Sequence, residues 1–106
     1  MEGQLVISPF VFVELLAYPR STGAFVQKFL EASCVVIDYK LKEMVWSEAG
    51  LRFARYSARR RQATGDGPRR LLADFLIGAH ALVQAERLLT LDPKRYRQDF
   101  PELRLL

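Results

Sequence analysis

The sequence has little cysteine, histidine or glycine, and it has no long apolar run. Its 106 residues include one cysteine, Cys34, one histidine and six glycines. A single thiol excludes an intrachain disulfide and a zinc site built from cysteines. The longest apolar stretch, residues 9–18, is interrupted by Glu14 and is too short to span a bilayer. No basic segment followed by a cleavage site opens the chain, so we expect a cytoplasmic protein.

The residues that are present indicate one folded domain with a basic surface. Half of them are hydrophobic, enough for one modest core, and the length corresponds to a single domain over residues 1–106. The formal net charge is +4, and positive residues cluster at 52–61 and at Arg69-Arg70. This clustering fits a polyanionic partner, but it fits a solvated helix face or an acidic protein partner as well.

Short β-branched segments alternate with helical patterns along the chain. Ser8-Pro9 is a helix-start signal, with a hydroxyl at the N-cap and proline at the first helical position. The alternation predicts an α/β fold with a mostly parallel sheet. The expected strands are 5–8, 34–37 and 88–91, followed by a closing strand; the expected helices are 9–18, 24–32, 41–62, one opened by Pro68, and a short one after residue 92.

Two acids stand beside apolar segments in the second half of the chain. Asp74 shares a helical stripe with small residues such as Gly78 and Ala81, which let another element approach closely. Burial of a carboxylate there is costly unless it is paired, hydrogen-bonded or bound to a metal. Asp92 follows the apolar segment 88–91, at the place where open α/β sheets hold their ligands.

A third acid, Glu14, is the only one between residues 5 and 18. The helix around it is apolar nearly all round, so we expect that helix to be buried. A lone carboxylate in such a helix is a candidate functional group. The alternative is a glutamate that pairs with an arginine or lies at the rim of the core.

The segment from Ala73 to Asp92 carries a family resemblance. An aspartate, Asp74, opens an alanine-rich helix, and an apolar segment ends in Thr90-Leu91-Asp92. Together with the ending over residues 95–105, this closely resembles the C-terminal half of PIN-domain nucleases, especially the VapC-like toxin ribonucleases. The resemblance extends more loosely back to residue 5, where Ser8 to Leu15 matches the family's serine and glutamate spacing. It implies a PIN-like three-layer sandwich.

The resemblance also implies a chemistry for the three acids. Glu14, Asp74 and Asp92 would be both the catalytic residues and the metal ligands of a ribonuclease that leaves a 3′-hydroxyl and a 5′-phosphate. Clustered carboxylates repel one another and need a cation. Their hard oxygen atoms suit Mg²⁺ or Mn²⁺, which activates water and stabilises charge on phosphate. A VapC-type toxin would also have an antitoxin protein as its partner.

Other residues support this site in the same reading. Five arginines are positioned to neutralise an RNA backbone, although a solvated helix end is about as good an explanation. The Thr90 hydroxyl is a candidate hydrogen-bonding group near the metal, with ordinary strand propensity as the alternative. The five arginines are Arg59, Arg60, Arg61, Arg69 and Arg70.

The sequence departs from the family at its start. A PIN domain opens with a strand that ends in an aspartate, its first metal ligand, and no such strand precedes Leu5. We therefore expect an N-terminally truncated fold and a weakened metal site. The runner-up function is a non-catalytic PIN remnant that binds RNA or another protein. A third reading discards the family and predicts that Asp74 pairs with an arginine.

A gap in the sheet predicts that the chain either repacks its sheet or pairs with a second copy, because unpaired inner strand edges invite another chain. Of the two we expect a strand-exchanged or tightly packed homodimer. We expect light scattering to give a mass of about twice the 12.2 kDa chain. A mass of one chain across a range of concentrations would contradict this expectation.

Overall fold

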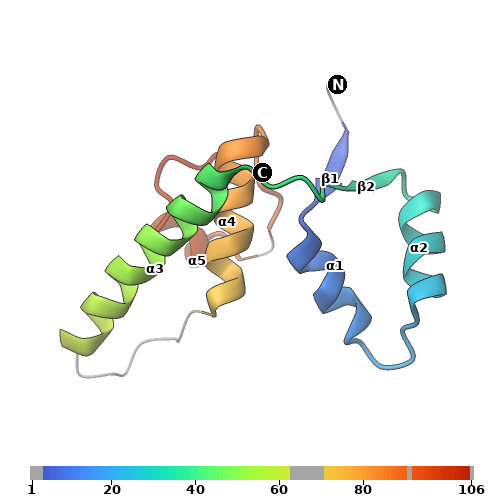
Figure 1. Cartoon of the computed structure of the whole chain (residues 1–106), viewed down its shortest axis with the longest axis horizontal. Helices are drawn as coiled ribbons and strands as arrows, with labels where there is room; N and C mark the ends of the chain where they lie inside the picture. The colour runs from blue at the N-terminus through green and yellow to red at the C-terminus, as the bar shows by residue number, and fades with distance from the viewer. Residues whose placement is uncertain (1–3, 63–70, 91, 106) are drawn as a thin grey trace. The chain divides into compact units, whose positions relative to one another are not determined.

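A computed structural model describes residues 4–62, 71–90 and 92–105, and it is mostly helical (Figure 1). The chain divides into two compact units after Lys40. The expectation of one domain over residues 1–106 stays a prediction. The elements in chain order are β1 (Leu5–Ile7), α1 (Pro9–Leu16), α2 (Gly23–Ala32), β2 (Val35–Ile37), α3 (Glu43–Gln62), α4 (Leu72–Gln84) and α5 (Lys94–Arg97).

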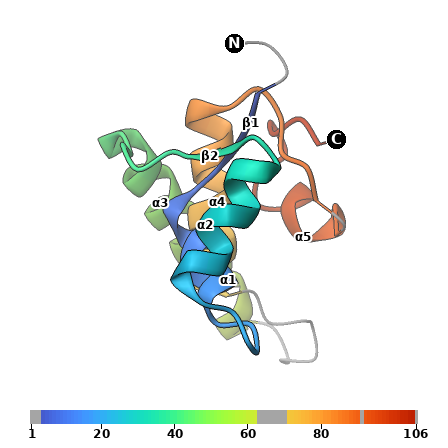
Figure 2. The same ribbon diagram turned by 90° about the vertical axis from the view of Figure 1, so that its right-hand side faces the viewer.

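The first unit is a pair of short parallel strands joined by two helices (Figure 2). Leu5 pairs with Val35, and the register continues to the ends of β1 and β2. The predicted helix start at Ser8 is confirmed, because its hydroxyl accepts the Val11 N–H at 3.3 Å and Pro9 opens α1. Thr22 caps α2 in the same way.

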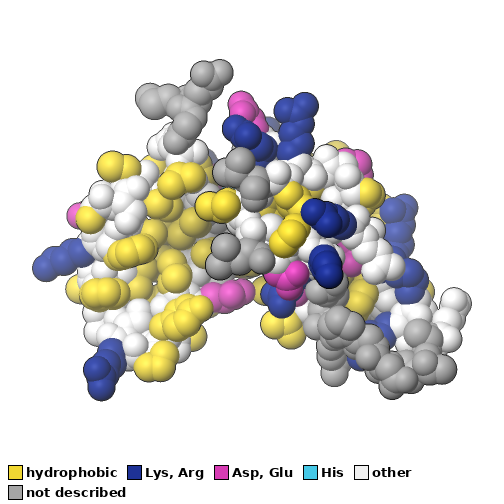
Figure 3. Space-filling model, turned by 180° about the vertical axis from the view of Figure 1, so that it is seen from behind, with side chains coloured by type: hydrophobic (Ala, Val, Ile, Leu, Met, Phe, Trp, Pro, Cys, Tyr) yellow, Lys and Arg dark blue, Asp and Glu magenta, His cyan; other side chains and the backbone are white. Residues whose placement is uncertain are grey.

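The first unit leaves much of its apolar surface exposed. We expected α1 to be buried, and this was wrong, because none of its residues is buried and Val13 is 63% exposed. Two three-residue strands and one further helix offer too little surface to cover a helix that is apolar on all sides. On α2 only Val26 and Leu30 are buried. Hydrophobic side chains accordingly gather on the surface of this unit (Figure 3).

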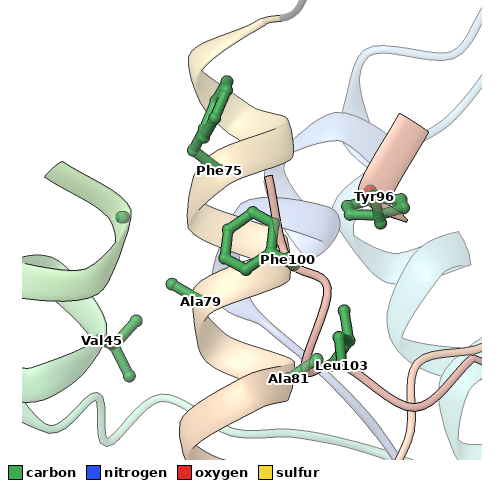
Figure 4. Close-up of a cluster of buried hydrophobic side chains, with 8 residues drawn as sticks. Val45, Phe75, Ala79, Ala81, Tyr96, Phe100 and Leu103 are labelled. Carbon is green, nitrogen blue, oxygen red and sulfur yellow. The ribbon is translucent and has the colours of Figure 1, made fainter. Parts of the chain in front are cut away.

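The second unit has a core formed by α3, α4 and the segment that begins at α5. Phe75 of α4 is 1% exposed and packs edge-on against Phe53 of α3, with ring centroids 5.2 Å apart. The Phe100 ring lies beside α4 near Ala79 (Figure 4), and its centroid is 6.2 Å from that of the Phe75 ring. The buried members are Val45, Ala49, Phe75, Ala79, Ala81, Tyr96, Phe100 and Leu103.

Gly78 permits the closest approach in this core. A Cβ atom on Gly78 would lie 2.6 Å from the nearest atom of the Phe100 ring. Carbon atoms in contact are normally 3.5–4.0 Å apart, so a methyl group at Gly78 would force the ring to move. The stripe of small residues around Asp74 was expected to let another element approach closely. The element that packs on it is the C-terminal segment, which contributes Phe100.

The predicted PIN-like three-layer sandwich with a mostly parallel sheet is wrong. Within the described residues β1 and β2 are the only strands, and they pair with each other. Of the expected strand over 88–91, the described residues 88–90 form only an isolated parallel bridge, between Leu88 and Leu105, and Leu89 is 64% exposed. Residue 91 lies outside the described residues. Apolar composition indicated burial there, but a strand also requires a neighbouring backbone to take its hydrogen bonds.

Within residues 4–62, 71–90 and 92–105, no helix combines the length and apolar character needed to cross a bilayer. The longest of the described helices, α3, carries three consecutive arginines, Arg59 to Arg61, in its last turn and ends at Gln62.

We predict that Gly78→Ala destabilises the protein by about 1–3 kcal/mol, the usual range for overpacking a core. Gly50→Ala is the matched control, because Gly50 also lies inside a helix and a Cβ there meets nothing within 4 Å. It should stabilise by about 0.5–1 kcal/mol. Chemical denaturation measures both changes. Equal effects of the two substitutions would show that Phe100 does not lie against Gly78.

Candidate functional site

Asp74 is held at the beginning of α4. One of its oxygen atoms, Oδ2, accepts a hydrogen bond from the Leu71 N–H at 3.0 Å. This contact satisfies one of the free N–H groups at the helix start, and it places negative charge near the positive end of the helix dipole. The side chain is only 11% exposed. The prediction that Asp74 points inward is confirmed.

Arg95 of α5 joins Asp74 to Asp92. Its Nη1 donates to Asp74 Oδ1 at 3.2 Å, and its Nε lies 3.5 Å from Asp92 Oδ2. Two of the three predicted site acids therefore lie at one guanidinium. Arg95 and Asp92 are 42% and 53% exposed at their side chains, so the pair opens to solvent on the Asp92 side.

A shallow hollow lies beside this pair. It leaves no room for a water molecule. The guanidinium of Arg95, rather than this hollow, contacts both aspartates. The hollow is lined by Asp74, Phe75, Arg95, Tyr96, Asp99 and Phe100.

Thr90 fixes the backbone at the second acid. Its hydroxyl oxygen accepts the Asp92 N–H at 3.1 Å, a local turn that threonine favours outside regular strands. The Thr90 side chain thus holds Asp92 in place, while its role beside a metal stays a prediction.

Glu14 lies in the middle of α1, in the first unit, and is exposed. Asp74 and Asp92 belong to the second unit, so convergence of all three acids stays a prediction. Over the described ranges, no group of three or more histidine, cysteine, aspartate or glutamate side chains is placed to hold a metal ion. The donor atoms have the hard-oxygen chemistry of a Mg²⁺ or Mn²⁺ site, but Arg95 now neutralises two of them.

The predicted RNA-binding arginines have different environments. Arg59 forms an ion pair with the buried Asp99, and its guanidinium lies over the Tyr56 ring at 5.9 Å. Arg60 and Arg61 complete the last turn of α3. Arg69 and Arg70 lie outside the described residues.

Sequence reasoning missed Arg52, the most connected arginine of the second unit. It is 8% exposed and pairs with Glu48 at 2.9 Å and with Glu102 at 2.5 Å. Its Nη1 donates to the Asp99 carbonyl at 2.8 Å, and the guanidinium lies 4.8 Å from the centroid of the Phe100 ring. The four-residue spacing of Glu48 and Arg52 was the only local signal.

The ion pair between Arg52 and Glu102 shifts the pKa of both side chains. Hydrogen bonding from Arg52 lowers the pKa of Glu102 to about 2. The Glu102 carboxylate raises the pKa of Arg52 in turn, against the opposing effect of burial.

Comparisons with protein-family models, with curated proteins and with solved structures find no match for this chain.

The Glu102 pKa predicts a pH dependence of stability. A carboxyl group whose pKa is lowered on folding stabilises the protein above its unfolded pKa of 4.5, and this contribution is lost as the pH falls toward 2. Glu102→Gln should remove this part of the acid dependence. Because the Glu102 side chain is 56% exposed, the loss at pH 7 should be only about 1 kcal/mol.

Denaturation measured between pH 2 and pH 7 checks this expectation, with Glu86→Gln as a control that removes the same charge from an exposed position. Parallel pH profiles for wild type and Glu102→Gln would contradict it.

Proposed function

We propose that this protein is a divalent-metal-dependent ribonuclease of the VapC type, in which Asp74 and Asp92 with Glu14 form the catalytic acids. The observation that carries the proposal is the position of Asp74 and Asp92 at one guanidinium. These acids come from a helix start and from a separate loop. Their proximity supports a common cation site rather than two unrelated surface charges.

Arg95 serves as the cation of this acidic pair. Two close carboxylates raise each other's proton affinity unless a positive charge lies between them. Arg95 is joined to Asp92 by a 3.5 Å contact and is 42% exposed, so its long side chain is free to leave toward solvent. Metal binding and Arg95 binding are therefore mutually exclusive at Asp74.

The acids have the donor chemistry for Mg²⁺ or Mn²⁺. Either ion bound there would supply an activated water and charge stabilisation for the scissile phosphodiester of RNA. Asp74 would hold the ion from the rigid start of α4, and Thr90 would keep Asp92 turned toward it by fixing the Asp92 backbone. The products would carry a 3′-hydroxyl and a 5′-phosphate. A cytoplasmic location of this protein, an antitoxin protein as its partner and a homodimeric assembly are part of the same proposal.

One observation favours a second candidate, a non-catalytic module that binds RNA or protein. Both oxygen atoms of Asp74 already have partners, the Leu71 N–H and Arg95. An aspartate that serves only to begin a helix and to fix α5 needs no metal. The reading that discards the family predicted this pairing of Asp74 with an arginine, and in that reading Asp74→Asn mildly lowers stability and changes nothing else.

Mn²⁺ titration by calorimetry, followed by an RNA cleavage assay, separates the two candidates. For the nuclease we expect micromolar binding by wild type, loss of binding and of cleavage in Asp74→Asn, and no change in the exposed control Glu86→Gln. Arg95→Gln should bind Mn²⁺ about tenfold more tightly, because the competing cation is removed.

Equal cleavage by wild type and Asp74→Asn would refute the site. If neither binds Mn²⁺ and neither cleaves, while Asp74→Asn is less stable, the non-catalytic module is the better description.

A further inference from the structure

The second unit has a larger hollow beside α3, away from the Asp74 and Arg95 pair. Its volume is about 210 Å³. A water molecule takes up about 30 Å³ in the liquid, so this space accommodates a group of several heavy atoms. We call it the α3 hollow; it is lined by Arg52, Arg55, Arg59, Gln98, Asp99, Pro101 and Glu102.

Three arginines contribute unequally to the α3 hollow. Arg52, Arg55 and Arg59 follow one another at helical spacing, so they lie along one side of α3. Arg52 forms ion pairs with two acids, Glu102 in the lining and Glu48 outside it. Arg55 is exposed, and it makes no hydrogen bond or ion pair with any residue that the structure describes. The residues that line the hollow carry a formal net charge of +1, from three arginines against Asp99 and Glu102, and Arg55 is the lining arginine without an ion pair to any described residue.

Arg59 is fixed in advance at the edge of the hollow. One Nη atom donates to the Asp99 carboxylate, whose side chain is only 4% exposed, and the guanidinium lies over the Tyr56 ring. A guanidinium has five N–H donors, so the Asp99 contact leaves others available to a ligand. Because the side chain is already ordered, little conformational entropy is lost when it binds an anion.

We infer that the α3 hollow binds a phosphate group of the RNA backbone. Arg55 and Arg59 donate to the phosphate oxygens, and the Gln98 carboxamide adds a neutral donor. Arg60 and Arg61 continue the positive charge along the last turn of α3, which matches a linear polyanion better than a single carboxylate. The inference rests on RNA as the proposed substrate, and it adds Arg55 and Gln98 to the residues that would recognise it.

The test is fluorescence anisotropy with a labelled single-stranded RNA and the full chain, in EDTA so that no cleavage occurs. Arg55→Gln should weaken binding about tenfold at low salt, as expected for loss of a charged hydrogen bond. It should also lower the slope of log Kd against log salt by about 0.7, one phosphate contact on a single strand. Arg87→Gln, an exposed arginine outside the hollow, is the matched control and should change Kd less than twofold.

Arg59→Gln should weaken RNA binding similarly, and its thermal unfolding is measured alongside because it also loses the Asp99 pair. Equal losses of RNA affinity in Arg55→Gln and Arg87→Gln would overturn the inference, because any positive charge on the surface would then contribute equally to RNA binding. A hexaglutamate peptide that binds with Arg55 dependence while RNA does not would overturn it as well, in favour of an acidic protein partner. If RNA binding depends on Arg55 but no RNA is cleaved in Mn²⁺, the phosphate site in the α3 hollow is supported and the ribonuclease proposal is rejected.

Discussion

The second unit depends on one buried cation, the guanidinium of Arg52. A buried guanidinium is costly unless its N–H groups are paired, and Glu48, Glu102 and the Asp99 carbonyl provide those partners. Two of these three come from the C-terminal segment, so pairing of Arg52 draws that segment onto α3. The same segment presents Phe100 to both Arg52 and Gly78. Arg52 thereby sets the position of the ring on which the packing of α4 depends.

Arginine plays the same part at each buried acid of this unit. Asp99 is paired with Arg59, and Asp74 is paired with Arg95. The difference lies in how firmly each arginine is held. Arg52 is enclosed, whereas Arg95 is half-exposed and reaches Asp92 only at 3.5 Å. Arg59 resembles Arg95 in this respect, because their side chains are 43% and 42% exposed, so exposure separates Arg52 from both and does not distinguish Asp74 from Asp99.

Local features of this chain were predictable from its sequence, and distant pairings were not. The start of α1 depends on the Ser8 hydroxyl and on Pro9, and both affect only the first turn of the helix, so their effect can be read from neighbouring residues. The inward position of Asp74 followed from its small neighbours. The sheet was predicted wrongly because the sequence of segment 88–91 reveals its apolar character. It does not reveal which other backbone segment would form hydrogen bonds with it. Arg52 was missed because its partner Glu102 lies far along the chain and leaves no periodic signal.

The close approach of Phe100 to Gly78 has a consequence for the order of folding. During synthesis α3 and α4 emerge from the ribosome before Phe100 and Leu103, so the two helices meet with one side of their interface unfilled. Contacts between segments far apart in sequence form slowly, because the intervening loop must close first. The docking of residues 98–105 onto this helical pair is therefore expected to be the late event, and until it occurs the nascent chain presents its aromatic cluster to chaperones.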